Sequence, residues 1–336
     1  MTYYSSPEKD AVRSYFETPL IRHLRKRKGR RLSYFGLPGE EARDIVDWSS
    51  ELEYVAAVEN RPKLLRNLES VLEQRFPHIQ RTTHLGDADA VIRNDVGKRR
   101  MIFGQLHQPR VSRFDKEAGE QAWHFDVVNL DYFGQFLPRV PGNAKGERLK
   151  ARNRTLALKQ LFERNRVDAW RPWLLLITVE AEQARQSSEE HKTYLQECKR
   201  NASQREKSAI DFLCSEGPTQ METATRLIMG TAALLLSAPA TAAGLSAQTR
   251  GAVMYHGSDD QPMVHLAFEF APLKGALPAR VSSLDLLRTP LLETLNPLEK
   301  PWLGLSANQV PGMTKELIQQ SLSFIPATGR NAILNA

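Results

Sequence analysis

The sequence predicts an α/β protein with a mostly parallel sheet and helices on both faces, and two patterns carry this prediction. From residue 31 to residue 89, apolar runs that end in turn residues alternate with helical stretches, as in parallel sheets. Residues 252–257 and 263–270 flank the turn sequence Ser-Asp-Asp-Gln-Pro, which indicates a hairpin. A chain of 336 residues has ample length for such a core.

The first half of the chain predicts three strands. Residues 31–39 form a strand-like run that breaks into Gly-Leu-Pro-Gly, and a helix is expected at 40–52. Residues 54–58 form a second apolar strand that ends at Glu59, and a helix is expected at 61–75 before a third segment that reaches Gly86. Glu59 lies about 20 residues past the glycine turn, the separation that places a carboxylate on a ribose hydroxyl.

A fourth strand is predicted within residues 125–134, and it ends in polar and aromatic side chains. Ligands of open α/β sheets bind just past the carboxyl ends of strands. A carboxylate and an amide there, Asp131 and Asn129, accept hydrogen bonds from an amino group and hold its lone pair in line for transfer. Asp126 alternates away from this position, so we expect it to make a structural hydrogen bond. Residues 171–180 predict the fifth strand.

From residue 31 to residue 272, this order of segments resembles the class I S-adenosylmethionine (SAM)-dependent methyltransferases. The resemblance implies a Rossmann-like, mostly parallel seven-stranded sheet with a terminal antiparallel hairpin, and SAM as cofactor. It also implies that Gly36 and Gly39 pass under the cofactor, that Glu59 binds the ribose and that Asp87 lies near adenine. The chain departs from the family at Leu37-Pro38, where a second glycine is common, and these two residues limit the approach of a ligand.

The segment 125–134 is similar to the fourth-strand motif of tRNA guanine-N2 methyltransferases, with Tyr132 in place of a proline. The resemblance implies that Asn129 and Asp131 orient an amine or ring nitrogen, and that Tyr132 or Phe133 stacks on an exposed base. Structural roles stay open for each site residue. Asn129 and Asp131 alternatively cap the next helix, Tyr132 and Phe133 belong to the core, Glu59 is a surface carboxylate, and Asp87 is a turn residue.

Two functions therefore remain: a methyltransferase acting on a nucleic-acid base, or an inactive relative that binds nucleic acid or assembles a complex. The net charge of +7 indicates an anionic partner, RNA or DNA. Basic residues cluster at 22–31, with Arg25, Lys26, Arg27 and Lys28 as the candidate phosphate contacts. Because this run precedes the first strand, we expect it at the amino edge of the sheet, opposite the cofactor; wrapping as an N-terminal arm is the other possibility. A solvated basic face without a ligand is the alternative.

Composition excludes several classes. The two cysteines, Cys198 and Cys214, rule out a disulfide framework or a cysteine-based zinc cluster, and they fit a reducing, cytoplasmic compartment. The histidines lack metal-ligand spacing, so no metal site is expected. Residues 227–245 carry no charge, but Pro239 and several polar residues favour a buried helix followed by a turn over a membrane span.

The chain divides into three predicted parts. Residues 1–30 form a basic N-terminal arm or helix, and residues 31–274 form the methyltransferase-like domain, with an insertion near 93–120. Residues 275–336 contain scattered prolines and form a C-terminal extension. We expect this extension to lie outside the sheet, where it wraps the core or offers a surface to a protein partner.

Overall fold

The computed structural model describes residues 7–93, 101–102, 105–106, 125–131, 157–158, 160–162, 172–181, 188–200, 207, 210–211, 213–216, 220–243, 245–256, 262–272 and 304–305. The N-terminal part contains α1 (Pro7–Val12), η1 (Arg13–Glu17), α2 (Thr18–Lys28), β1 (Leu32–Gly36), α3 (Arg43–Trp48), β2 (Leu52–Glu59), α4 (Pro62–Arg75), β3 (Gln80–Leu85) and α5 (Ala88–Arg93). The remainder contains β4 (Met101–Ile102), β5 (Gln105–Leu106), β6 (Val127–Asp131), β7 (Trp173–Glu180), α9 (Ser188–Lys199), α11 (Gln220–Ala242), β8 (Leu245–His256), β9 (Pro262–Pro272) and β10 (Gly304–Leu305).

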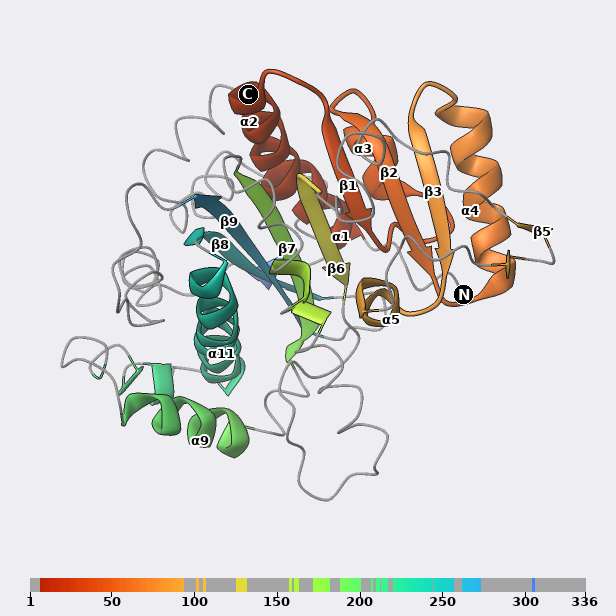
Figure 1. Ribbon diagram of the computed structural model, residues 1–336. Coiled ribbons are helices and arrows are strands. Elements are labelled where there is room, and N and C mark those ends of the chain that lie inside the picture. The colour runs from red at the N-terminus through yellow and green to blue at the C-terminus, as the bar shows by residue number, and fades with distance from the viewer. Residues whose placement is uncertain are drawn as a thin grey trace.

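One sheet organises these elements, with the strand order β10-β8-β9-β7-β6-β1-β2-β3 (Figure 1). The central strands pair in parallel, whereas β9 runs antiparallel to both β7 and β8. The chain thus winds outward from β1 to β3 and returns to place β6 on the other side of β1. This confirms the predicted Rossmann-like sheet with its terminal hairpin. Between β1 and β6 lies the switch point at which ligands of such sheets bind.

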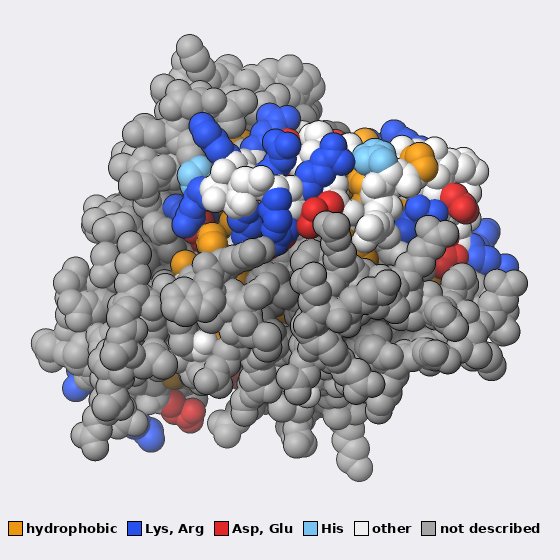
Figure 2. Space-filling view, turned by 45° about the horizontal axis from the view of Figure 1, so that its top comes forward, with side chains coloured by type: hydrophobic (Ala, Val, Ile, Leu, Met, Phe, Trp, Pro, Cys, Tyr) orange, Lys and Arg blue, Asp and Glu red, His pale blue; other side chains and the backbone are white. Residues whose placement is uncertain are grey.

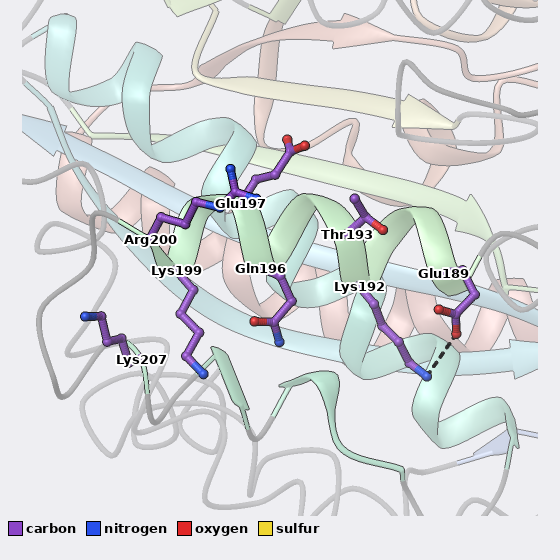
Figure 3. A pocket seen from close by; sticks show the side chains of 8 residues that line it. All are labelled: Glu189, Lys192, Thr193, Gln196, Glu197, Lys199, Arg200 and Lys207. Atoms are coloured by element: carbon purple, nitrogen blue, oxygen red, sulfur yellow. Dashed lines mark hydrogen bonds and ion pairs between the residues drawn. The ribbon is translucent and has the colours of Figure 1, made fainter.

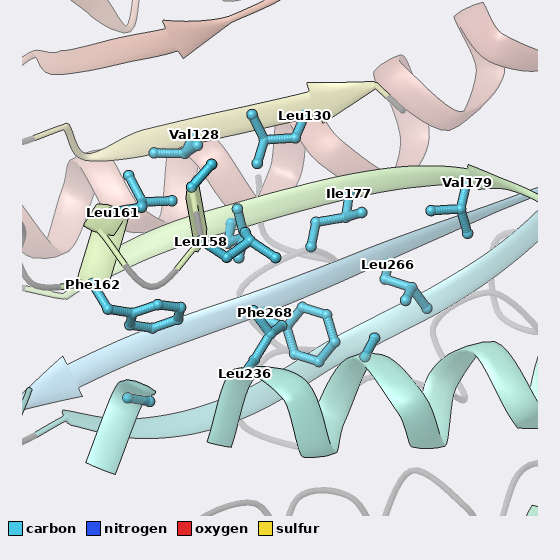
Figure 4. Close-up of a cluster of buried hydrophobic side chains, with 14 of the residues drawn as sticks. Val128, Leu130, Leu158, Leu161, Phe162, Ile177, Val179, Leu236, Leu266 and Phe268 are labelled. Atoms are coloured by element: carbon cyan, nitrogen blue, oxygen red, sulfur yellow. The ribbon is translucent and has the colours of Figure 1, made fainter. Parts of the chain in front are cut away.

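Helices cover both faces of the sheet, as predicted. On one face, α11 packs against the sheet, and its Leu236 lies beside Phe268 of β9 in a cluster that also includes Ile177 and Val179 of β7 and Leu266 of β9 (Figure 4). On the other face, side chains of α2, α3 and α4 pack together with the inner side chains of β1 and β2. The N-terminal arm is therefore part of the core in the described structure, because α2 buries the Leu20, Ile21 and Leu24 face that recurs at helical spacing.

Three boundaries differ from the sequence prediction. The first helix, expected at 40–52, is only α3, because Gly39 (φ 68°) and Ala42 (φ 52°) hold the preceding turn in the left-handed region. Pro239 does not end α11, which continues to Ala242. Packing of the buried Leu236 and Ala240 outweighs the backbone hydrogen bond that proline removes. The first hairpin strand begins at Leu245 and not at residue 252.

The C-terminal extension was expected outside the sheet, and this is wrong in one respect. Residues Gly304–Leu305 form β10, which pairs in parallel with Met254 and Tyr255 of β8 at the sheet's edge. Within the insertion, β4 and β5 pair with each other in a separate small antiparallel sheet. Among the described residues, none of the helices combines the length and the apolar character that a membrane span requires.

At the amino edge of the sheet, Asp126 links the start of β6 to the start of β1 and to the residues just before β1. Its side chain is fully buried and accepts hydrogen bonds from the backbone N–H of Ser33 (2.8 Å) and from both terminal nitrogens of Arg30 (2.9 and 3.0 Å). Lys28, whose side chain is 3% exposed, forms a further ion pair with Asp126. The structural role predicted for Asp126 is therefore confirmed.

Candidate functional site

The carboxyl edge of the sheet, where β1, β2, β3, β6 and β7 end, brings the predicted site residues together. In the strand register, Gly36 pairs with Asn129 across the switch point, and Glu59 pairs with Leu85 of β3. Asp131 ends β6, two residues beyond Asn129. Tyr132 and Phe133 lie outside the described residues, so their expected stacking role stays a prediction.

Close contacts within the protein explain why residue 36, at the start of the glycine turn, is a glycine. A Cβ atom on Gly36 would lie 2.3 Å from the Oη atom of Tyr34 and 2.7 Å from the backbone oxygen of Asn129. Residue 36 must therefore be glycine for β1 and β6 to approach each other with Tyr34 in place. Gly39 and Ala42 adopt positive φ in the same turn, and for Ala42 this costs strain of the kind that gathers at functional sites.

The two predicted nucleoside contacts lie in different surroundings. Glu59 is buried at the end of β2, where its Oε1 accepts a hydrogen bond from the backbone N–H of Arg61 (2.9 Å) and lies 3.6 Å from that residue's Nε. Asp87 is exposed and directly precedes α5, and its carbonyl oxygen accepts from the N–H of Val91 (3.0 Å). Glu59 is thus a preorganised carboxylate, whereas Asp87 also has the position of a helix cap.

Asp44, in the first turn of α3, joins these elements, and the sequence reasoning missed it. Its Oδ2 accepts hydrogen bonds from the hydroxyl of Tyr34 (3.0 Å) and from Nδ2 of Asn129 (2.9 Å). Its Oδ1 accepts from Nε of Arg13 (2.7 Å). Because a carboxylate only accepts, the Asn129 amide must turn its nitrogen towards Asp44, and its carbonyl oxygen faces elsewhere. The only signal in the sequence that could have indicated Asp44 is its position, as an acidic residue in the first helix after the glycine turn.

The N-terminal segment supplies cations to this edge. Lys9 of α1 forms an ion pair with Asp131, whose side chain is 11% exposed. Burial alone would lower the pKa of Lys9, but the charge and hydrogen bond of Asp131, together with the charges of Tyr255 and Asp44, outweigh it and the pKa is raised. The pKa of Arg13 is likewise raised, since its acidic neighbours, Asp44 foremost, together outweigh the effect of burial. Both cations therefore stay protonated, and the carboxylate predicted to orient an amine is already paired with one.

A buried acid and a buried histidine complete the group. Burial and the charge of Asp44 raise the pKa of Glu17 to about 8, and burial lowers the pKa of His265 to about 3. Nε2 of His265 lies 3.1 Å from Oε1 of Glu17, and its Nδ1 lies 3.0 Å from the hydroxyl of Thr178. Both groups are thus uncharged at neutral pH, and a protonated Glu17 carboxyl lies close enough to donate its O–H to Nε2 of the neutral imidazole.

We call this group the carboxyl-edge cluster; its members are Lys9, Arg13, Glu17, Asp44, Asn129, Asp131, Thr178, Tyr255 and His265. The cavity that these side chains and Val12 enclose has a volume of about 10 Å³, which is room for about one water molecule. The cluster is therefore closed. Among the described residues, no group of three or more histidine, cysteine, aspartate or glutamate side chains has a metal-binding arrangement.

A second hollow, of about 670 Å³, lies along α9. Lys192 there pairs with Glu189 (3.3 Å), and Lys199 pairs with Asp211. Lys192, Gln196 and Lys199 point to one side of the helix while Thr193 and Glu197 point to the other, so the lining does not converge (Figure 3). This hollow offers no single binding centre.

The basic run divides into exposed and internal residues. Lysine and arginine side chains gather at the amino edge, with a few acidic side chains between them (Figure 2). Arg25, Lys26 and Arg27 are exposed, although Arg25 lies 3.1 Å from Glu51 and Arg27 pairs with Glu269. Lys28 differs from its neighbours because its side chain is buried and forms an ion pair with Asp126. The expected position of the run, opposite the carboxyl edge, is confirmed.

No family model and no curated protein matches this chain. Among solved structures, Trm1 from Pyrococcus horikoshii with S-adenosyl-L-methionine is similar, with 11% identity, 81% of this chain and 57% of that chain covered, and a TM-score of 0.43. Trm5b from Pyrococcus abyssi has 9% identity, coverages of 78% and 52%, and a TM-score of 0.34. A SAM-dependent methyltransferase from Agrobacterium tumefaciens has 11% identity, coverages of 80% and 64%, and a TM-score of 0.35. The chain thus spans about half to two thirds of the length of these proteins, and similarity this weak assigns no function.

Proposed function

We propose that this chain is a SAM-dependent methyltransferase that acts on an amino group or ring nitrogen of a nucleic-acid base. One observation carries the proposal. Asn129 and Asp131 end the strand at the switch point, Gly36 is paired with Asn129, and the buried Glu59 ends the strand on the far side of Gly36. An acceptor pair and a nucleoside-type carboxylate therefore flank the position at which open α/β sheets bind ligands.

The residues of this edge fit SAM in their chemistry. A carboxylate has about four acceptor positions, and the Glu59 contacts with Arg61 leave some for the two ribose hydroxyls. The backbone from Gly36 to Gly39 would pass under the cofactor, and Asp87 would lie near its adenine. Bound there, SAM would supply an activated sulfonium methyl group, which leaves alignment and proton acceptance to the protein.

The binding of the methyl-accepting amine follows from the hydrogen bond between Asp44 and Asn129. With its amide nitrogen on Asp44, Asn129 offers its oxygen to an N–H of the substrate amine. Asp131 accepts a second N–H and stabilises the positive charge that develops on the nitrogen as it is methylated. Tyr132 or Phe133 would stack on the exposed base. This arrangement requires that Lys9 leave Asp131, because a carboxylate paired with an ammonium offers less to a second amine.

The exposed basic residues support a nucleic acid as the substrate. Arg25, Lys26 and Arg27 lie at the amino edge, and the strands between the two edges have five to eight residues. At roughly 3.3 Å per residue, the two edges are about 17–26 Å apart. A substrate that touches both must be a polyanion of several nucleotides and not a free nucleotide. The free cysteines Cys198 and Cys214 agree with a cytoplasmic enzyme, where thiols stay reduced.

Two measurements test the proposal. Calorimetry should show SAM binding, and Glu59→Ala should weaken it by about 1–3 kcal/mol through loss of charge-assisted hydrogen bonds. Glu53→Ala, at the other end of the same strand, is the matched control and should leave SAM affinity unchanged. A folded wild-type protein that binds no SAM would overturn the cofactor assignment.

The second measurement is methyl transfer to total cellular RNA and DNA. Asp131→Asn keeps the shape but removes the charge, and it should lower turnover by about 100-fold with SAM affinity retained. Asp211→Asn, beside α9, serves as the control. Equal turnover of Asp131→Asn and wild type would show that Asp131 does not orient the acceptor.

The closed carboxyl-edge cluster favours one alternative, an inactive relative that binds nucleic acid or assembles a complex. Its cavity of about 10 Å³ and the paired Asp131 are what a purely structural ion network would show. Salt-dependent binding of RNA without any SAM binding or methyl transfer would favour this alternative.

A further inference from the structure

We infer that α1 is a displaceable cap, whose Lys9 ammonium occupies on Asp131 the position that the substrate's amino group takes. The inference rests on the proposed function and concerns the regulation of the same site. Substrate and Lys9 would then compete for one carboxylate, and the closed structure would be the resting state of the enzyme.

Space is the first argument. Among the described residues, the cavity that Lys9 and Val12 of α1 line beside Asn129 and Asp131 holds about one water molecule, so it has no room for a base while α1 is in place. The contact that closes it is chemically like the proposed substrate contact, because an amino nitrogen of Lys9 donates to the carboxylate of Asp131. A cap that imitates the acceptor nitrogen keeps the buried carboxylate satisfied until substrate arrives.

The local backbone supplies a hinge. Between α1 and α2 the chain forms η1, a π-helical turn in which the N–H and the hydroxyl of Thr18 both bond to the carbonyl of Arg13. Such turns interrupt the regular hydrogen-bonding pattern of an α-helix and are frequent at functional sites. The break lies between the segment that carries Lys9 and the segment that anchors α2.

Anchoring differs on the two sides of this hinge. At the start of the hinge, Arg13 is bound to Asp44 (2.7 Å), and just beyond it Thr18 accepts a hydrogen bond from Nε1 of Trp48 (3.0 Å). The contacts of α1 include the ion pair of Lys9, whose side chain is 25% exposed, the ion pair of Asp10, 39% exposed, with Arg13 (2.6 Å), and the buried Val12. Both ions regain hydration when they part, so an ionic contact opens more readily than an apolar one of equal area.

Hydrogen exchange tests the motion on the free protein. Amides of residues 8–12 should exchange by local opening, faster than those of α2, and Lys9→Met should accelerate them further while α2 is unchanged. Lys9→Arg, which keeps the charge, should behave like wild type, and Lys192→Met on α9 is the matched control. If α1 and α2 exchange together, and only through global unfolding in a urea series, α1 is a fixed part of the core and the inference is wrong.

Kinetics with total cellular RNA test the competition. Lys9→Met should lower KM for RNA by about fivefold while kcat is retained. This factor is the shift in the open–closed equilibrium of α1 that loss of a partly exposed ion pair produces. An unchanged or raised KM would overturn the competition even if α1 opens. If wild type methylates neither RNA nor DNA, the proposed function fails and the competition with it, while exchange still decides whether α1 is mobile.

Discussion

Replacing Asp126 with asparagine should be among the most damaging single changes in this protein, although Asp126 lies at the edge opposite the proposed site. The side chain has no exposed surface, and the cation that it pairs with, Lys28, is 3% exposed. The asparagine would keep the shape and an acceptor for Ser33, but the buried Lys28 would lose its ion pair with the Asp126 carboxylate. Removal of one member of a buried pair costs about 3–5 kcal/mol.

A double-mutant cycle separates this penalty from the loss of the pair itself. Lys28→Met alone leaves Asp126 with Arg30 and Ser33, so it should cost about 1–2 kcal/mol. Asp126→Asn with Lys28→Met should be more stable than Asp126→Asn alone, with a coupling energy of about 2–3 kcal/mol that exceeds the cost of Lys28→Met, because the ammonium is removed together with the carboxylate.

Urea denaturation followed by circular dichroism provides the free energies, and an unchanged m-value shows that the variants unfold the same surface. A loss below about 1 kcal/mol for Asp126→Asn, or strictly additive single changes, would refute the reasoning. Lys28 would then contribute little to the fold, and the phosphate-binding role that the sequence alone suggested for the whole basic run would extend to it.

Three further predictions follow from the site and the basic run. Glu17 has a folded pKa of about 8 against 4.5 unfolded, and His265 about 3 against 6.5. The folded state therefore holds the extra Glu17 proton from pH 4.5 to 8, and stability falls with pH there. His265 acts oppositely up to about pH 6.5 and offsets part of this, so about 1 kcal/mol should be lost between pH 6.5 and 8. Thermal unfolding at both pH values checks this, and an equal loss in Glu17→Gln would contradict it. Gly36→Ala should cost about 1–3 kcal/mol in urea, since the new Cβ meets the Asn129 backbone oxygen; wild-type stability would show that β1 and β6 separate freely. Serine at residues 25–27 should flatten the slope of log affinity for RNA against log salt by about 0.7–0.9 for each phosphate that the protein no longer neutralises, and an unchanged slope would favour a merely solvated face.

Much of the sheet followed from local patterns. Five apolar runs that end in glycine or acidic residues, and the turn sequence between two more, were enough to place seven strands in order. Side-chain alternation along β6 also separated Asp126, which is structural, from Asn129 and Asp131 on the other end of the strand. These signals are local, because strand period and turn chemistry depend on neighbouring residues.

Boundaries were less accessible from the sequence, because tertiary contacts decide them. Pro239 reads as a helix end, yet the helix continues where Leu236 and Ala240 are buried. The short β10 forms only because β8 offers it an open edge. A two-residue strand carries no pattern of its own.

Local sequence patterns were enough to predict the architecture and to place Gly36, Glu59 and Asp131 at the carboxyl ends of neighbouring strands. The pairing of charges depended on the fold. Lys9 pairs with Asp131 at a separation of 122 residues, and Lys28, alone among four adjacent basic residues, is buried against Asp126. Charged side chains carry no local mark of their partners. A lysine can be a solvated surface residue, a member of a buried ion pair or a cap over a site. Which of these it becomes depends on the distant carboxylate that the fold brings beside it and on how much water surrounds the two.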